Sequence, residues 1–170
     1  MVKVKFEKIS PADFFYRNRD IAGFSSPSRS LYMSIRELVE NSLDAAEVGR
    51  ILPNIIVELS SEENSDENAS IYKLRVEDNG IGVAPEHIPK AFGTVFYGSK
   101  YGYKQSRGTF GLGGTMALLY GQITTNKPAT VVSSQGGSEI HKFVLMIDIV
   151  KNEPKVFKHE VFENKKKWHG

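Results

Sequence analysis

The stretch that most constrains this chain is Ser34–Glu47, with the sequence SIRELVENSLDAAE. On a helical wheel of about 100° per residue, Asn41 and Asp44 fall within about 40° of Glu37. The opposite side carries apolar residues: Leu31, Ile35, Leu38, Val39 and Ala46. The pattern predicts an amphipathic helix that packs an apolar stripe on a core and lines up two carboxylates and a carboxamide on its other face. For this segment alone, a solvated helix face is the alternative interpretation.

A second acidic position, Asp78, comes at the end of a predicted strand. The segment Ile71–Glu77 alternates, and its apolar face consists of Tyr72, Leu74 and Val76. Asp78 continues that series, and a carboxylate in phase with a buried face is costly unless it accepts hydrogen bonds. The exocyclic amine of an aromatic base would satisfy it. The alternative is a plain turn, because Asp-Asn-Gly is also a common hairpin signal.

A glycine-rich segment follows. Residues 93–114 hold seven of the chain's 15 glycines, too many for regular structure. The segment also supplies three cations: Lys100, Lys104 and Arg107. It leads into a helix that is predicted to begin near Gly113 or Gly114 and to end at Gly121, and the backbone amides at a helix N-terminus form an anion site. The alternative is a mobile surface loop.

A phosphate loop of the Walker type is excluded. Residues 108–115 have the glycine spacing of that loop, but Gly114 stands where its lysine must be, and no strand precedes the segment. The dinucleotide pattern G-x-G-x-x-G is absent as well. A phosphate site in this segment must therefore have another architecture.

Helices and strands are expected in an order typical of an α+β protein. The predicted helices are residues 11–18, 27–48, 85–92 and 115–120. The predicted strands are residues 55–59, 71–77, 130–134, 140–150 and 156–162. Helices precede and interrupt the strands, so we expect a two-layer α/β sandwich with a mixed, mostly antiparallel sheet and helices on one face.

Composition limits the class of protein. The chain has 170 residues, of which 40% are apolar and 25% charged, as in an ordinary soluble domain. A net charge of +2 gives no strong field toward DNA or a membrane. The lack of cysteine excludes disulfides and thiolate metal sites, and no apolar run reaches the ~18 residues of a membrane span. A cytoplasmic location without membrane contact is the default expectation.

Three segments together resemble the ATP-binding superfamily of gyrase, heat-shock chaperones, histidine kinases and MutL, whose domain has the Bergerat fold. They are ELVENSLDA at 37–45, DNGIG at 78–82 and GTFGLG at 108–113. The match is closer still to the B subunits of archaeal-type DNA topoisomerase VI, and it covers nearly the whole chain. The segments that resemble that family are ISPADFFYRNRDIAGF, RELVENSLDA, ILPNI, VEDNGIG, AFGTVFYGSKY and IDIVKNEPK.

The resemblance implies ATP and Mg²⁺ as cofactors and assigns roles to residues. Glu37 resembles the base that activates the attacking water, Asn41 resembles the Mg²⁺ ligand, and Asp78 resembles the acceptor of the adenine amine. The remaining nucleotide-binding positions resemble a phosphate-binding lid: Ser99, Lys100, Gly108, Thr109, Phe110, Gly111, Leu112, Gly113, Gly114 and Thr115.

The resemblance also implies an assembly. In this family an ATP-operated clamp of two B subunits joins the topoisomerase VI A subunits in a heterotetramer, dimerises with nucleotide, and acts on DNA in the nucleoid. Residues 1–24 are expected to form an arm exchanged between subunits, and residues 25–170 to form the ATP-binding domain. The family's helix-two-turns-helix and transducer domains, the latter with a lysine for the terminal phosphate, have no counterpart here. We therefore expect a C-terminally truncated portion that binds ATP with little turnover.

Two alternatives stay open at this point. One is a non-catalytic, nucleotide-sensing dimerisation module. The other is an ATPase of the related MutL, chaperone or histidine kinase group. Glu37 argues against a histidine kinase, which normally has asparagine at that position.

Overall fold

The computed structural model describes residues 7–62, 70–98 and 112–170. Its elements in chain order are α1 (Pro11–Arg17), the 3-10 helix η1 (Arg19–Ala22), α2 (Pro27–Val48), β1 (Ile56–Glu62), β2 (Ile71–Glu77), α3 (Ile88–Gly93), α4 (Gly113–Thr125), β3 (Ala129–Ser133), β4 (Glu139–Asp148) and β5 (Glu153–Glu163). Part of the predicted phosphate-binding lid lies outside the described ranges: Ser99, Lys100, Gly108, Thr109, Phe110 and Gly111.

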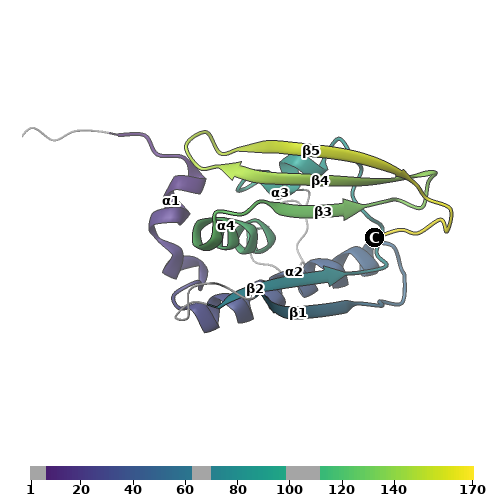
Figure 1. Cartoon of the computed structure of the whole chain (residues 1–170), viewed down its shortest axis with the longest axis horizontal. Coiled ribbons are helices and arrows are strands. Elements are labelled where there is room, and N and C mark those ends of the chain that lie inside the picture. The colour runs from purple at the N-terminus through teal and green to yellow at the C-terminus, as the bar shows by residue number, and fades with distance from the viewer. Residues whose placement is uncertain (1–6, 63–69, 99–111) are drawn as a thin grey trace, which may run out of the picture.

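The described strands form two antiparallel sheets. β1 pairs with β2, while β4 pairs with β3 on one side and with β5 on the other. Figure 1 shows the three-stranded sheet at the top, the β1–β2 hairpin with α2 at the bottom, and α4 between these layers. The α+β class is confirmed. The predicted single sheet is divided here into two, and every strand pair in the described ranges is antiparallel.

Helix α4 is the centre of the main core. Its buried residues Met116, Ala117 and Leu119 pack with Val95, which follows α3 (Ile88–Gly93), and with Ile147 on β4. A smaller cluster lies where α3 covers β4: Ile88, Phe143 and Leu145. Because α4 is apolar on most sides, it packs between the three-stranded sheet and the layer that contains α2. This packing determines the position of its N-terminus. Among the helices that the structure describes, none is long and apolar enough to cross a membrane.

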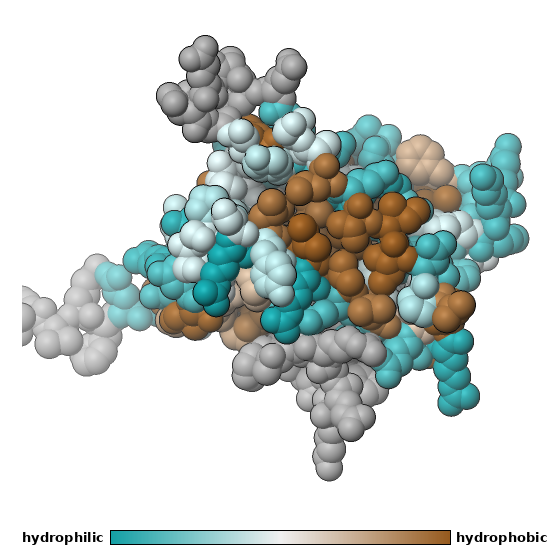
Figure 2. Space-filling model, turned by 90° about the horizontal axis from the view of Figure 1, so that it is seen from below, coloured by the Kyte–Doolittle hydropathy of each residue, from teal (hydrophilic) through white to brown (hydrophobic). Residues whose placement is uncertain are grey.

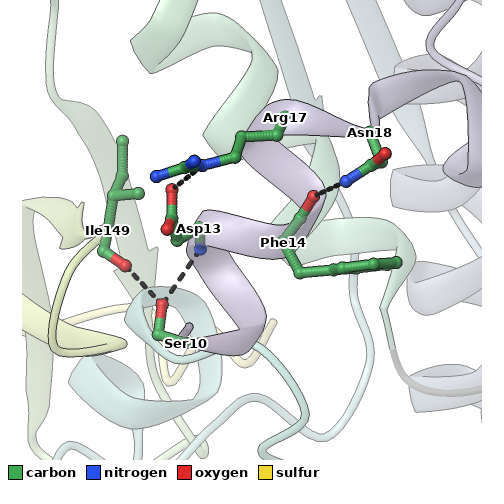
Figure 3. Close-up of polar contacts among 6 residues, drawn as sticks. All are labelled: Ser10, Asp13, Phe14, Arg17, Asn18 and Ile149. Atoms are coloured by element: carbon green, nitrogen blue, oxygen red, sulfur yellow. Dashed lines mark hydrogen bonds and ion pairs between the residues drawn. The ribbon is translucent and has the colours of Figure 1, made fainter. Parts of the chain in front are cut away.

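Helix α1 begins at the predicted cap. The Ser10 hydroxyl accepts a hydrogen bond from the Asp13 backbone N–H at 3.0 Å and donates one to the Ile149 carbonyl at 2.5 Å (Figure 3). The Arg17 guanidinium pairs with the Asp13 carboxylate at 2.9 Å, one turn away. The cap therefore both starts the helix and attaches it to the turn after β4.

The segment after this cap shares a core with the rest of the chain. Phe15 and Phe24 are buried in the same cluster as α4. The Phe15 ring also lies 5.8 Å from the ring of Phe96, centroid to centroid. α1 and η1 thus pack as part of the same core as α4, and the exchange of residues 1–24 between subunits stays a prediction.

The predicted end of α4 at Gly121 is wrong. The helix continues to Thr125, and Asn126 at φ 54° ends it in the left-handed region. The reason is the side chain of Gln122, which donates to the Ile147 carbonyl at 2.9 Å and accepts from the Ile147 N–H at 2.8 Å. These two bonds tie the last turns to β4 and offset the ~1 kcal/mol that a glycine costs inside a helix.

The β1–β2 hairpin adds little to the core. Every residue of β1 is exposed, including three apolar ones: Ile56, Val57 and Leu59. Figure 2 views the molecule from below, the side on which α2, β1 and β2 lie in Figure 1, and shows apolar side chains gathered over the middle of that face. The clean alternation of β2 therefore predicts the strand correctly but does not predict deep burial, since Tyr72 is exposed as well.

One glycine of the Asp-Asn-Gly-Ile-Gly segment is required by the backbone. Gly82 has φ +68°, and a Cβ at this position would collide with the carbonyl oxygen of Ser134. Replacing Gly82 with alanine is expected to lower the free energy of unfolding by at least about 1–3 kcal/mol. Urea denaturation checks this. Gly137→Ala is the matched control, because a Cβ there meets nothing within 4 Å, and equal losses in both variants would contradict the prediction.

Candidate functional site

The predicted amphipathic helix is confirmed as α2. It opens at Ser26, whose hydroxyl accepts from the Arg29 N–H at 3.4 Å, and continues to Val48. Of the predicted apolar stripe Ala46 is buried and the other four members are half-buried: Leu31, Ile35, Leu38 and Val39. On the other side Glu37 is half-buried and Asn41 is exposed. The helix therefore presents its carboxylate and carboxamide outside the core, at a surface that a ligand can reach.

The first turn of α4 lies directly on this polar face. A Cβ built on Gly113 would collide with the Glu37 carboxylate, and one built on Gly114 would lie 2.8 Å from the Asn41 side-chain nitrogen. A larger residue at either position would force the Glu37 or Asn41 side chain to move. The structure thus brings together four residues that the sequence analysis had placed in separate motifs, from α2 and from the start of α4.

The start of α4 has the features of an anion site. Among the described residues, no side chain caps the helix at Leu112, so its first backbone N–H groups are not used by a cap. The 13-residue helix adds a partial positive charge at the same end. Glu37 and Asn41 lie against this end, which places a helix N-terminus, a carboxylate and a carboxamide within one small region.

Asp78 lies beside α2 as well, further along the helix than Glu37 and next to its apolar stripe. Its carboxylate accepts a hydrogen bond from the Ser42 hydroxyl at 2.9 Å and from the Gly80 N–H at 2.8 Å. The turn therefore packs against α2, where a Cβ on Gly80 would lie 2.6 Å from the Ala45 Cβ. Asp78 thus stabilises its own turn, as the turn interpretation expects, and attaches that turn to α2, while its role as the acceptor of an adenine amine stays a prediction.

Ser42 is a site residue that the sequence analysis missed. It is buried, and its hydroxyl also contacts the Leu38 carbonyl at 3.1 Å. The signal was present in the sequence: Ser42 falls four residues after Leu38 and four before Ala46, so it is a polar residue inside the apolar stripe. Such a residue needs a buried partner, and Asp78 is that partner.

Asn79 is a second residue that was missed. Its side chain accepts from the Asn54 N–H at 2.8 Å and donates to the Leu52 carbonyl at 3.1 Å. These bonds hold the loop before β1 against the turn after β2. Asn79 therefore positions the backbone next to Asp78.

The two ends of the site are separated by the length of a short helical segment. Glu37 and Ala45 are eight residues apart on α2, which corresponds to about 12 Å along the helix axis. Near Ala45 lies Gly80 of the Asp78 turn, and near Glu37 lies the positive end of α4. One end suits a planar group with a hydrogen-bond donor, and the other suits an anion.

Two predicted lid residues at the start of α4 face the interior. The Thr115 hydroxyl is buried and donates to the Leu112 carbonyl at 2.9 Å, and Leu112 packs against the main core. Their roles in this structure are to hold the first turn of α4 together and to anchor it. A direct contact of either side chain with nucleotide stays a prediction.

The groups for a divalent cation are few. Within the described ranges, no three His, Asp or Glu side chains converge to hold a metal ion by themselves. Mg²⁺ usually takes one or two protein ligands, keeps several waters and binds phosphate oxygens. The Asn41 carboxamide beside the start of α4 fits that mode, because a bound phosphate would complete the oxygen set.

Comparison with known proteins identifies the family. The family model described as histidine kinase-, DNA gyrase B-, and HSP90-like ATPase matches residues 27–148. The chain belongs to this ATPase family. The match contains α2, Asp78 and the first turn of α4, so every described part of the site lies within it. The predicted fold class is confirmed by the same finding.

Several relatives are similar over the whole chain. The B subunit of type 2 DNA topoisomerase 6 from Sulfurisphaera tokodaii is 50% identical over 173 residues, which cover all of this chain and 32% of the relative. The corresponding protein of Saccharolobus islandicus strain Y.N.15.51 is 48% identical over 169 residues, 99% of this chain and 31% of the relative. The chain thus spans about a third of the length of the curated relatives that it matches.

Proposed function

We propose that this chain binds Mg²⁺-ATP as the ATPase domain of the B subunit of a type IIB DNA topoisomerase. The observation that carries the proposal is the close approach of Gly113 and Gly114 to Glu37 and Asn41, with Asp78 bound to Ser42 further along the same helix. The similarity to topoisomerase 6 B subunits over the whole chain supports the choice within the ATPase family.

The nucleotide lies along the polar face of α2 in this proposal. Adenine occupies the end near Ala45, where its amine donates to the Asp78 carboxylate that Ser42 orients. The phosphates point to the start of α4, where backbone amides and the helix dipole favour negative charge. The triphosphate and the base are thereby placed at opposite ends of about 12 Å of helix.

Asn41 holds the metal and Glu37 acts on water in this proposal. Mg²⁺, when bound through the Asn41 carboxamide and the phosphates, neutralises phosphate charge. The Glu37 carboxylate, one turn away on the same face, orients a water toward the terminal phosphate and accepts its proton. The start of α4 stabilises the charge that remains on the phosphate oxygens.

The assembly belongs to the same proposal. Two B subunits dimerise with nucleotide, join A subunits and gate the passage of one DNA duplex through another, in the nucleoid of the cytoplasm. Residues 1–24 supply an arm that crosses to the partner. DNA relaxation by the complete B and A subunits, measured with and without ATP, tests this part.

Titration calorimetry tests the nucleotide site. The chain is titrated with a non-hydrolysable ATP analogue, with Mg²⁺ and with EDTA, and then with the corresponding GTP analogue. Binding of the ATP analogue that is tighter with Mg²⁺ and weaker for the GTP analogue supports the site. Absence of binding heat and of any protection from hydrogen exchange would overturn it.

Replacing Asn41 with alanine separates the metal from the rest of the site. The variant is expected to bind the ATP analogue about three- to tenfold more weakly in Mg²⁺ and to differ much less from the parent in EDTA, because only the metal contact is lost. Calorimetry measures both affinities. Equal losses in Mg²⁺ and EDTA would show that Asn41 contacts the nucleotide and not the metal.

A further inference from the structure

Residues 168–170 lie against the turn that holds Asp78. The Gly170 N–H donates to the Ser134 carbonyl at 3.0 Å, and the Gly170 carbonyl accepts from the Ser134 N–H at 3.1 Å. A Cβ on Gly170 would lie 2.2 Å from the Asp78 carbonyl oxygen, so the two backbones are in direct contact. In Figure 1 the C-terminus accordingly lies between β3 and the β1–β2 hairpin. The turn after β2 is therefore packed on two sides, by α2 and by residues 168–170.

Buried polar side chains hold this segment in place. The Asn164 side chain is buried, donates to the Trp168 carbonyl at 2.7 Å and accepts from the Trp168 N–H at 2.8 Å. The Ser133 hydroxyl is also buried, donates to the Gly170 carbonyl at 2.8 Å and accepts from the Val83 N–H at 2.8 Å. Buried polar groups with all their partners make a structure rigid. The residue between Trp168 and Gly170 is therefore held from both sides.

That residue is His169, and its ring is hydrogen-bonded to the turn. Its Nδ1 lies 2.7 Å from the carbonyl oxygen of Gly80. A carbonyl only accepts, so Nδ1 carries a proton and donates it, and the neutral ring has the Nδ1–H tautomer. Gly80 is buried, and its N–H donates to the Asp78 carboxylate at 2.8 Å. Gly80 is thus held at its N–H by Asp78 and at its C=O by His169.

We propose that His169 is a positioning residue for recognition of the base, and that it acts through Gly80 on Asp78. The Asp78 carboxylate is oriented by two donors, the Ser42 hydroxyl and the Gly80 N–H. Glycine imposes little restraint on its own backbone, so the second donor keeps its place only if the turn is held from outside. The hydrogen bond from His169 supplies that restraint. This role rests on the proposed function, and it concerns the base and not the phosphates.

Nuclear magnetic resonance of the chain without nucleotide tests the contact itself. The nitrogen shifts of the neutral His169 ring are expected to show a proton on Nδ1 and none on Nε2. In His169→Leu the Gly80 amide should exchange about three- to tenfold faster, because the loss of one hydrogen bond lets the turn open more often. His169→Asn has the same branching as leucine and keeps a donor at the position of Nδ1, so its Gly80 amide should exchange as in the parent.

Calorimetry with the ATP and GTP analogues tests the consequence for the nucleotide. His169→Leu is expected to bind the ATP analogue about three- to tenfold more weakly and the GTP analogue as the parent does. Guanine carries a carbonyl oxygen where adenine carries its amine, so it does not use the oriented carboxylate in the same way. His169→Asn should keep the affinity and the preference of the parent. A change that only loosened the fold would weaken both nucleotides alike.

His159→Leu is the matched control. It removes an imidazole from β5, where the ring stacks on Phe143 of β4 with centroids 4.0 Å apart, and it should leave both affinities unchanged. Circular dichroism checks that each variant folds.

The remaining outcomes overturn the proposal. A proton on Nε2 of His169, or equal exchange of the Gly80 amide in His169→Leu and the parent, excludes the contact. The positioning role fails if His169→Leu binds the ATP analogue as the parent does, if it loses both analogues equally, or if His169→Asn is as weak as His169→Leu. A parent chain that binds neither analogue overturns the proposed function and this role with it, while the tautomer and the exchange rates still decide whether the contact exists.

Discussion

Replacing Glu37 with glutamine is expected to leave Mg²⁺-ATP binding nearly intact and to slow ATP hydrolysis by about 10²–10⁴-fold, the usual span for a general base. Glutamine keeps the size and the oxygen of the side chain, so α4 can still approach through Gly113. It cannot accept the proton of the attacking water. Phosphate release by the complete B subunit that we propose measures the rate, and calorimetry measures binding.

The control for this variant is Asp44→Asn, which removes a carboxylate from the same face of α2, seven residues further on. If only Glu37 acts as the base, the control keeps most of the hydrolysis rate. Loss of binding in the Glu37 variant, with hydrolysis per bound ATP unchanged, would assign Glu37 to holding the nucleotide. An unchanged hydrolysis rate would show that Glu37 is not the base.

Nucleotide binding and ATP hydrolysis have different requirements in this chain of 170 residues. The proposed base, the proposed metal ligand and most of the proposed phosphate site lie within residues 37–115, so we expect binding to need little else. The family resemblance assigns a further cation at the terminal phosphate to a transducer lysine, and loss of such a group commonly costs 10²–10³-fold in rate. We therefore expect this chain alone to bind Mg²⁺-ATP and to hydrolyse it slowly.

The sequence predicted the elements whose patterns are local. The wheel of α2 gave its polar face and its buried Ala46, and Ser10 and Ser26 marked two helix starts because a serine cap with a following proline acts within one turn. The alternation of Ile71–Glu77 gave β2 with its observed bounds. Local hydrogen-bonding and periodicity therefore sufficed for these elements.

Contacts between distant segments were not predictable in the same way. Nothing near Gly121 in the sequence shows that Gln122 binds both backbone groups of Ile147, 25 residues away. The contact of Gly113 with Glu37 depends on how α4 is placed by the core. Ser42 could have been found as a polar residue in an apolar stripe, but its partner Asp78 is 36 residues away.

The division of the strands into two sheets also depends on contacts between segments that are distant in the sequence. Strand patterns predict which face is apolar, and they do not specify which edges pair. β1 and β2 pair with each other, and β3–β5 form a meander through short connections. The predicted single sheet assumed a pairing between these groups that no local pattern encodes.

Replacing Asp78 with asparagine is expected to preserve the fold and to weaken ATP binding at least tenfold, or ~1.4 kcal/mol. The Gly80 N–H donates to one oxygen of the Asp78 carboxylate. In the variant the single amide oxygen is therefore expected to face the Gly80 N–H. The amide nitrogen then faces Ser42, whose hydroxyl can accept as well as donate. The turn therefore survives, but the group that we propose to face the adenine amine changes from an acceptor to a donor.

The same change predicts altered base selectivity. In the variant, the side-chain amide at position 78 and the adenine amine are both donors, so neither finds an acceptor, and the loss in binding free energy is about 1–3 kcal/mol. The carbonyl oxygen of guanine can instead accept a hydrogen bond from the new amide. The Asp78 variant should therefore lose most of its preference for ATP over GTP, as measured by calorimetry with both analogues. Asp148→Asn is the matched control, because Asp148 also ends a strand and accepts from a backbone N–H, that of Lys151 at 2.9 Å. If the Asp78 variant binds ATP as the parent does, or if the Asp148 variant loses as much, Asp78 does not read the adenine amine and the base lies elsewhere on α2.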